Sequence, residues 1–198
     1  MSDQEENPST PSDDNFVPPP KETIDQILNK DVEDESLRKY KEKLLGQAAK
    51  GVPKTDDPRL VVIKSFGVTF PNKEHADIIR ELDTKQKEED LKKSAIVIKE
   101  GSDYQFVVCF KVQHEIVSAL KFSNSVYKAS IRVEKKDHMI GSFAPSDVEN
   151  TWKSPIFSAP SGLLARGSYK ANTKFIDDDK KTHLELDYAI SIQKDFEG

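Results

Sequence analysis

The sequence contains few of the residues on which several protein classes depend. Its single cysteine, Cys109, cannot build a disulfide framework. No run approaches the ~20 consecutive apolar residues that a membrane-spanning helix needs. The first residues show neither the basic start nor the apolar stretch of a secretory signal, and no lipidation motif occurs. These absences predict a cytoplasmic protein without stable membrane insertion.

Patterns for catalysis and metal binding are also missing. The four histidines, at 75, 114, 138 and 183, lack the mutual spacing of metal ligands, and we expect them at the surface. No phosphate-binding glycine loop, nucleophile elbow or Cys-X-X-Cys pair is present. Cys109 falls inside a strand pattern, which favours a buried structural role over a nucleophile. We therefore expect a binding protein rather than an enzyme, with no cofactor and no metal.

The surplus of acidic residues lies in one part of the chain. The formal net charge is -5; residues 1–50 contain 12 acidic and 7 basic side chains, and residues 51–198 contain 23 of each. A balanced body predicts no nucleic-acid binding, because phosphate contacts need an excess of Lys and Arg. The acidic segment either steers the chain toward a basic protein surface or merely solvates a tail.

Composition divides the chain into three segments. Five of the 11 prolines lie within residues 1–20, and we expect residues 1–22 to be a disordered acidic tail. Residues 23–58 form a predicted regulatory arm, in which apolar residues at helical spacing indicate a hairpin of two short helices before a linker. Helices this short are marginal alone. The hairpin therefore folds either on a partner or on the chain's own body.

From residue 59 to 198 the apolar period changes to two. This period predicts eight or nine short strands, at Leu60–Phe70, Ala95–Lys99, Tyr104–Gln113, Ile116–Phe122, Val126–Val133, Met139–Ala144, Leu163–Phe175 and Leu184–Gln193. The turn Glu100–Asp103 indicates a hairpin, while Asp77–Lys93 fits a loop or one helical turn. So many strands without interleaved helices are typical of an all-β, antiparallel β-sandwich.

The inner faces of this sandwich present large side chains, such as Tyr104, Phe110, Leu186 and Tyr188. They suit the wall of an apolar slot between the sheets and an ordinary dry core equally, and the pattern alone favours the core. The acidic run Asp177–Asp179 lacks the alternating spacing of a calcium loop, which favours a solvated turn.

Several exact segments resemble the Rho GDP-dissociation inhibitor family. The run DESLRKYKE at 34–42 resembles the arm motif of that family. Five further segments resemble parts of the family's sandwich domain: KEG at 99–101, EIVS at 115–118, MIGS at 139–142, LARGSY at 164–169 and DDDK at 177–180. They follow the family's order between about Ile24 and Phe196.

The resemblance implies an immunoglobulin-like sandwich behind a flexible arm. Such a protein binds prenylated Rho-family small GTPases in the GDP-bound form as a 1:1 heterodimer, extracts them from membranes and slows GDP release. The implied prenyl-binding residues, for a geranylgeranyl group, are Val68, Ile96, Tyr104, Ile116, Leu120, Leu164, Leu186 and Tyr188. The implied GTPase-binding residues are Asp34, Ser36 and Tyr40 in the arm and Glu134 and Asp179 on the sandwich.

The chain departs from the family at three places, one of which is Pro71–Lys93, a stretch a few residues longer than in the better-known members. Leu186, Tyr188 and Phe196 stand where tryptophans are frequent, which predicts a slot of different shape. Phe157 and Ser158 stand where better-known members carry acidic residues, which shifts charge steering to the arm. Two alternatives remain. One is a general prenyl or lipid carrier without GTPase regulation, which would have no use for the arm motif. The other is a hydrolase or transferase on a sandwich scaffold, against which the missing acid–base residues argue.

Overall fold

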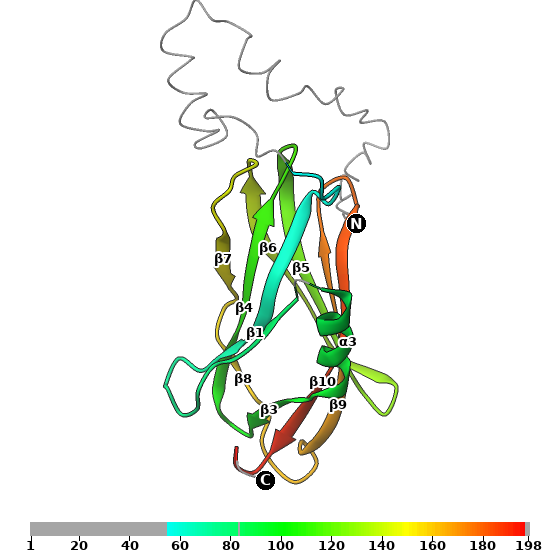
Figure 1. The fold of residues 1–198 in the computed structure, drawn as a ribbon. Coiled ribbons are helices and arrows are strands. Elements are labelled where there is room, and N and C mark those ends of the chain that lie inside the picture. Colours follow the sequence, from blue (N-terminus) through cyan, green and yellow to red (C-terminus); the bar gives the residue numbers. More distant parts are fainter. Residues whose placement is uncertain (1–54, 83, 197–198) are drawn as a thin grey trace, which may run out of the picture.

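Two β-sheets packed face to face make up residues 55–82 and 84–196, the part of the chain that this computed structural model describes (Figure 1). The first sheet is ordered β2 (Ile78–Glu81), β1 (Val61–Thr69), β4 (Asp103–Val112) and β7 (Asn150–Lys153), with β8 (Phe157–Ser158) also paired to β4. The second is ordered β3 (Ile96–Lys99), β10 (Thr182–Gln193), β9 (Gly167–Ile176), β5 (Val117–Lys128) and β6 (Ile131–Phe143). The predicted all-β sandwich is confirmed.

The alternation that predicted the strands also sets which face each one buries. Along β4 every second side chain, from Tyr104 to Val112, is buried, and its neighbours are half-buried. Leu186, Tyr188, Ile190 and Ile192 do the same on β10. Because successive strand residues point to opposite faces, the two inner faces meet as one apolar layer.

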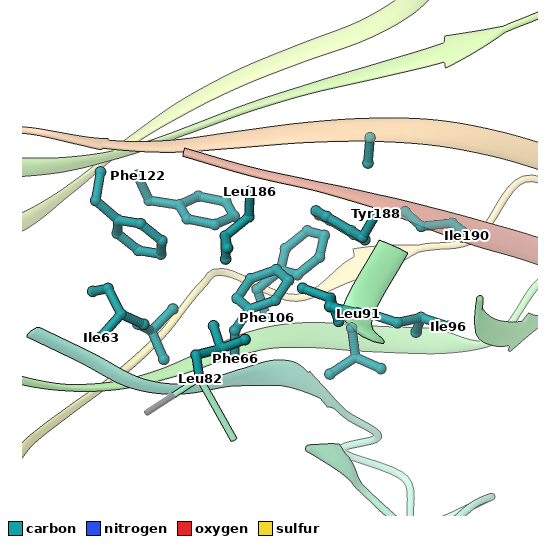
Figure 2. Packing of buried hydrophobic residues seen from close by; sticks show 14 of the residues in the cluster. Ile63, Phe66, Leu82, Leu91, Ile96, Phe106, Phe122, Leu186, Tyr188 and Ile190 are labelled. Atoms are coloured by element: carbon teal, nitrogen blue, oxygen red, sulfur yellow. The ribbon is translucent and has the colours of Figure 1, made fainter. Parts of the chain in front are cut away.

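Aromatic rings join the two sheets at the centre of this layer. Phe66 of β1 stacks on Phe106 of β4 with 5.8 Å between ring centroids, and it meets the edge of Tyr188 from the other sheet at 5.1 Å. Phe122 of β5 lies 5.3 Å from Phe106. Figure 2 shows these rings with Leu186 between the sheets. The middle of the sandwich is therefore a filled core.

The hairpin predicted across Glu100–Asp103 is wrong. β3 pairs in parallel with β10, with Ile96 opposite Ile190, whereas β4 belongs to the other sheet. At Gly101, φ is +71° and the N–H donates to the carbonyl of Ala159 at 3.0 Å. The connection therefore crosses between the sheets. Alternation identifies two strands but does not choose their partners.

The predicted strand break near residues 123–125 is also wrong. β5 continues through these polar residues, because Ser123 Oγ donates to Asp137 Oδ1 at 2.5 Å and Thr173 Oγ1 donates to Asn124 Oδ1 at 2.8 Å. The chain turns instead at Ala129 and Ser130, with φ of +47° and +69°. Positive φ at both positions is what a two-residue hairpin turn of type I′ requires, but neither residue type indicates it.

The stretch that the sequence left open forms β2 and the helix α3 (Lys85–Lys93). Thr84 caps the helix by accepting a hydrogen bond from the N–H of Lys87 at 3.4 Å. Leu91 on the helix and Leu82 before it are buried in the same apolar cluster as the strands. The helix lies beside β10 (Figure 1), so it covers one open side of the sandwich.

Two surface and burial predictions fail at individual side chains. Cys109 is partly exposed rather than buried, and its Sγ donates to Glu149 Oε2 at 3.2 Å. Desolvation, followed by this contact, raises the pKa of the thiol, which disfavours the reactive thiolate. His183, expected at the surface, has a side chain only 2% exposed, with Nε2 at 2.9 Å from Asp177 Oδ2.

Candidate functional site: an apolar pocket at one end of the sandwich

A pocket of about 500 Å³ opens between the sheets at the end where β3 finishes, drawn at the bottom of Figure 1. Small-molecule sites in proteins usually occupy roughly 300–1,000 Å³. Both sheets and the connections at this end supply its wall, which consists of Ile98, Tyr104, Val126, Lys128, Val133, Glu134, Ser158, Ala159, Pro160, Leu164, Tyr169, Ile190 and Ile192. Most of these side chains are apolar.

The pocket forms where the facing side chains become small. Tyr188 on β10 meets the ring of Phe66, and this half of the inter-sheet space is filled. Ile190 and Ile192 continue the same face of β10, and the residues that line the pocket with them include the short Ala159 and Pro160 as well as Tyr104 and Leu164. Short side chains cannot span the separation of two packed sheets, which is roughly 10 Å. A cavity therefore remains.

Polar groups gather at the rim of the pocket. The carboxylate of Glu134 lies 2.8 Å from Lys136 Nζ. Burial, with a smaller contribution from the charge of Glu134, raises the pKa of Tyr104, so its hydroxyl stays a neutral donor. Lys128 Nζ donates to the carbonyl of Leu164 at 2.5 Å and to Tyr169 Oη at 3.3 Å. The arrangement is an apolar interior with charges confined to its edge.

A structured turn at residues 160–166 forms one lip of the pocket. Arg166 donates two hydrogen bonds to the carboxylate of Glu100, at 2.6 and 2.8 Å. The N–H of Gly162 donates to Glu100 Oε2 at 2.9 Å. The hydrogen bond from Arg166, ahead of the one from Gly162, lowers the pKa of Glu100 to about 2. The lip is therefore fixed by an ionised pair at neutral pH.

The structure places three of the predicted site residues in this pocket. Tyr104 and Leu164, predicted to bind a prenyl chain, line it, and Glu134, predicted to face a GTPase, stands at its rim. Five other predicted prenyl residues lie in the filled core beyond the pocket, all buried: Val68, Ile96, Leu120, Leu186 and Tyr188. On β3 and β10 they occupy the same strand faces as the pocket residues.

The remaining predicted residues lie elsewhere. Ile116 is half-buried just before β5, and Asp179 is exposed in the β9–β10 connection, where the N–H of Asp178 donates to the carbonyl of Ser118 at 3.1 Å. The register of the strands puts both positions at the end of the sandwich away from the pocket. Asp34, Ser36 and Tyr40 lie outside the described residues.

Sequence reasoning assigned only three of the thirteen lining residues to a site and missed the other ten. Four of these ten are buried aliphatic residues on strands. Ile98, Val126, Ile190 and Ile192 each follow a predicted or core residue at even spacing on the same strand face. Continuing the alternation to the strand ends would have found them. Phe157, singled out only as a departure, packs 5.8 Å from the ring of Tyr104 and carries Lys136 Nζ 3.8 Å above its own ring.

These features define a class of protein before any relative is considered. Within residues 55–82 and 84–196, no three His, Cys, Asp or Glu side chains gather as metal ligands would. None of the helices in that part of the chain is long and apolar enough to cross a membrane. A rigid sandwich with an apolar pocket and a charged rim is suited to holding an apolar group by burial. The fold and site are those of a β-sandwich binding protein.

Comparison with known proteins identifies the family. The family described as RHO protein GDP dissociation inhibitor matches residues 1–195. The putative rho GDP-dissociation inhibitor 1 of Dictyostelium discoideum is 42% identical over 100% of this chain and 99% of its own length. The Rho GDP-dissociation inhibitor 1 of Homo sapiens is 38% identical, covering 92% and 87%, and the probable rho GDP-dissociation inhibitor of Caenorhabditis elegans is 37% identical, covering 98% and 100%. The chain belongs to the Rho GDP-dissociation inhibitor family, and it is a regulatory inhibitor of that kind.

Proposed function

We propose that the pocket receives the geranylgeranyl chain of a Rho-family small GTPase, which the protein holds in its GDP-bound form as a 1:1 heterodimer. The observation that carries the proposal is the apolar pocket of about 500 Å³ in a chain of this family. In this role the protein acts without catalysis and in the cytoplasm, where it keeps the GTPase off the membrane.

The physical reason is the cost of exposing the lipid. A geranylgeranyl chain has about twenty carbons, and at roughly 0.8 kcal/mol per buried CH₂ its burial is worth on the order of 10 kcal/mol. A GTPase can leave a bilayer only if another apolar site offers a comparable gain. In this proposal the geranylgeranyl chain enters beside Ile190 and Ile192 and runs along the inner face of β10. Tyr188 and Leu186 shift to admit its far end.

The polar rim then meets the protein part of the partner. Glu134 and Asp103, whose carboxylate accepts a hydrogen bond from Ser158 Oγ at 2.6 Å, place negative charge around the opening. That charge favours a basic segment next to the lipid-bearing end of the GTPase. The arm residues Asp34, Ser36 and Tyr40 bind the switch loops and restrain them, which slows GDP release.

The pocket is tested with two matched valines. Val133 lines the pocket and is 53% exposed; Val148 is 52% exposed and lies outside it. Val133→Asp introduces a second carboxylate beside Glu134, and we expect it to weaken binding of a fluorescent geranylgeranylated peptide about tenfold or more. Val148→Asp should leave the affinity unchanged. Equal affinities for the two variants would contradict the assignment of the pocket.

The arm is tested separately from the pocket. Asp34→Ala in the full chain should accelerate release of a fluorescent GDP analogue from bound, prenylated GTPase, while uptake of the prenylated peptide stays the same. If the unsubstituted protein takes up the peptide but does not slow GDP release, it is a general carrier of lipidated proteins. In that case the alternative function would replace the proposed one.

A further inference from the structure

Two leucines at the lip of the pocket are held in water. Leu163 is 81% exposed and Leu164 is 92% exposed, the two largest exposures among the large apolar side chains that the structure describes. Leu164 also lines the pocket, and Val133 and Ile131, from the β5–β6 hairpin, are exposed by more than half. An exposed apolar cluster of this kind at the edge of a pocket marks an interaction surface.

The turn that carries these leucines is rigid rather than loose. Glu100 accepts hydrogen bonds from both Gly162 and Arg166. The N–H of Ala165 donates to the carbonyl of Gly162 at 2.9 Å, and Lys128 Nζ ties the carbonyls of Leu164 and Arg166 to the β5–β6 hairpin. The backbone is therefore fixed while its apolar side chains point away from the core. Exposure is built into the turn.

Basic residues lie on the segments that form this lip and on the strands that continue from it. Residues 125–133 and 159–174 contain five basic side chains and no acidic one: Lys128, Arg132, Arg166, Lys170 and Lys174. The carboxylate of Glu134, which follows Val133 at the pocket rim, is paired with Lys136. Arg166 is paired with Glu100 and Lys174 with Glu185. That leaves three positive charges here without an acidic partner among the described residues. Two of them, Arg132 and Lys170, flank Tyr127 in one row across β6, β5 and β9.

We propose that the turn at residues 160–166 and the β5–β6 hairpin beside it, together called the lip, dock reversibly on the surface of an anionic phospholipid bilayer. The leucines enter the boundary between headgroups and acyl chains, and Arg132 and Lys170 lie against the lipid phosphates. The inference rests on the proposed function, because docking in this orientation turns the pocket opening toward the membrane from which a prenyl chain would come.

A lipid surface fits this lip better than a folded protein does. The apolar side chains protrude, whereas a protein hot spot usually consists of a large side chain that fits a matching pocket. Positive charges around a protruding apolar tip are the pattern of interfacial membrane binding. A few charges and two leucines give weak binding, which suits a protein that must leave the membrane again.

The test measures flotation of the full chain alone, without any GTPase, with vesicles. The vesicles consist of phosphatidylcholine with about 30% phosphatidylserine, which gives them a negative surface. We expect measurable binding at low salt and none to pure phosphatidylcholine. In 1 M NaCl the Debye length falls to about 3 Å, so the charges are screened and binding should be lost. Leu163→Ser and Lys170→Glu should each lower the partition coefficient about fivefold or more.

Matched variants separate docking from general surface effects. Val148→Ser removes an exposed apolar side chain away from the lip, and Lys121→Glu reverses an exposed charge on the half of β5 away from the pocket. Both should bind vesicles as the unsubstituted chain does. If the unsubstituted chain fails to float, or if the lip variants and these controls lose binding equally, the proposal is overturned.

Uptake of the geranylgeranylated peptide without vesicles distinguishes this proposal from the one it rests on. Leu163 does not line the pocket, so Leu163→Ser should keep normal uptake while losing vesicle binding. Vesicle binding together with no uptake in the unsubstituted chain would reject the proposed function and leave the docking surface. If Leu163→Ser instead weakens binding of prenylated GTPase in lipid-free solution and leaves vesicle binding intact, the lip contacts the GTPase and the membrane proposal is wrong.

Discussion

The two halves of the space between the sheets differ although the same strands bound both. In one half, Phe66 reaches across to Tyr188 and Phe106 reaches across to Phe122, and these rings leave no room. In the other half, Ile190 and Ile192 share the space with Ala159 and Pro160, and a pocket of about 500 Å³ remains. The comparison teaches that an alternating strand builds a core or a binding site according to the size of what faces it.

The largest expected effect tests the filled half. Phe66→Ala removes a ring that contacts Phe106, Phe122 and Tyr188, and we expect it to lower the free energy of unfolding by about 3–5 kcal/mol. Tyr104→Ala in the pocket half should cost less, because that side chain already borders a cavity. Urea unfolding of both variants measures the difference. Equal costs would mean that the two halves are packed alike.

A polar network inside the filled half gives the next effect. Thr173 Oγ1 donates to Asn124 Oδ1, which also accepts from Tyr188 Oη at 3.2 Å, and all three residues are buried. Thr173→Val removes one donor from this buried acceptor and should destabilise the protein by about 1–3 kcal/mol. Thr182→Val, at an exposed position of β10, is the control and should change stability by less than about 0.5 kcal/mol.

Most strands of the sandwich could be predicted from the sequence, because burial of one face requires strict alternation on strands such as β4 and β10. What it could not supply was pairing and turns. The polar run around Asn124 looked like a turn because its partner, Thr173, is 49 residues away. The real turn at Ala129 and Ser130 has positive φ without glycine, so no residue type marked it.

The site was predictable only where it repeats a local pattern. Tyr104 and Leu164 were found through family resemblance, and Ile190 and Ile192 follow from alternation. The division between core and pocket depends on Ala159, whose place opposite β10 results from the crossing of the chain between sheets after β3. A wrong hairpin at that crossing hides the division, because it puts β3 and β4 in one sheet.

A third prediction tries to convert the pocket half into a filled half. Ala159→Leu adds apolar volume to a lining position whose backbone is held by hydrogen bonds to Gly101 and Ser102. We expect uptake of the geranylgeranylated peptide to weaken about tenfold, which is about 1.4 kcal/mol, because the added side chain occupies the space the lipid needs. The stability should change by less than that.

The control for this change is Ala189→Leu on β10, a half-buried alanine that points away from the pocket-lining face. Its peptide affinity should equal that of the unsubstituted chain. Should Ala159→Leu bind the peptide normally, the lipid does not use this part of the space, and the small residues opposite Ile190 would lose their assigned importance.

The smallest expected effect is a pH dependence confined to the lip of the pocket half. Because Arg166 and Gly162 bind its carboxylate, the pKa of Glu100 falls from 4.5 to about 2 in the folded protein. A lowered pKa means that the ionised form favours the fold, so this contribution is fully present above about pH 4.5 and is lost as the pH falls toward 2. The filled half contains no such pair among the residues that form it.

The NMR shift of the Gly162 amide proton measures this loss directly, since that N–H donates to Glu100 Oε2. We expect it to titrate with an apparent pKa near 2 while core amides such as that of Phe106 stay unchanged, and we expect the titration to vanish in Glu100→Gln. A midpoint near 4.5 would show that Arg166 does not hold the carboxylate in solution. The rigid turn, and the exposure of Leu163 that depends on it, would then need another support.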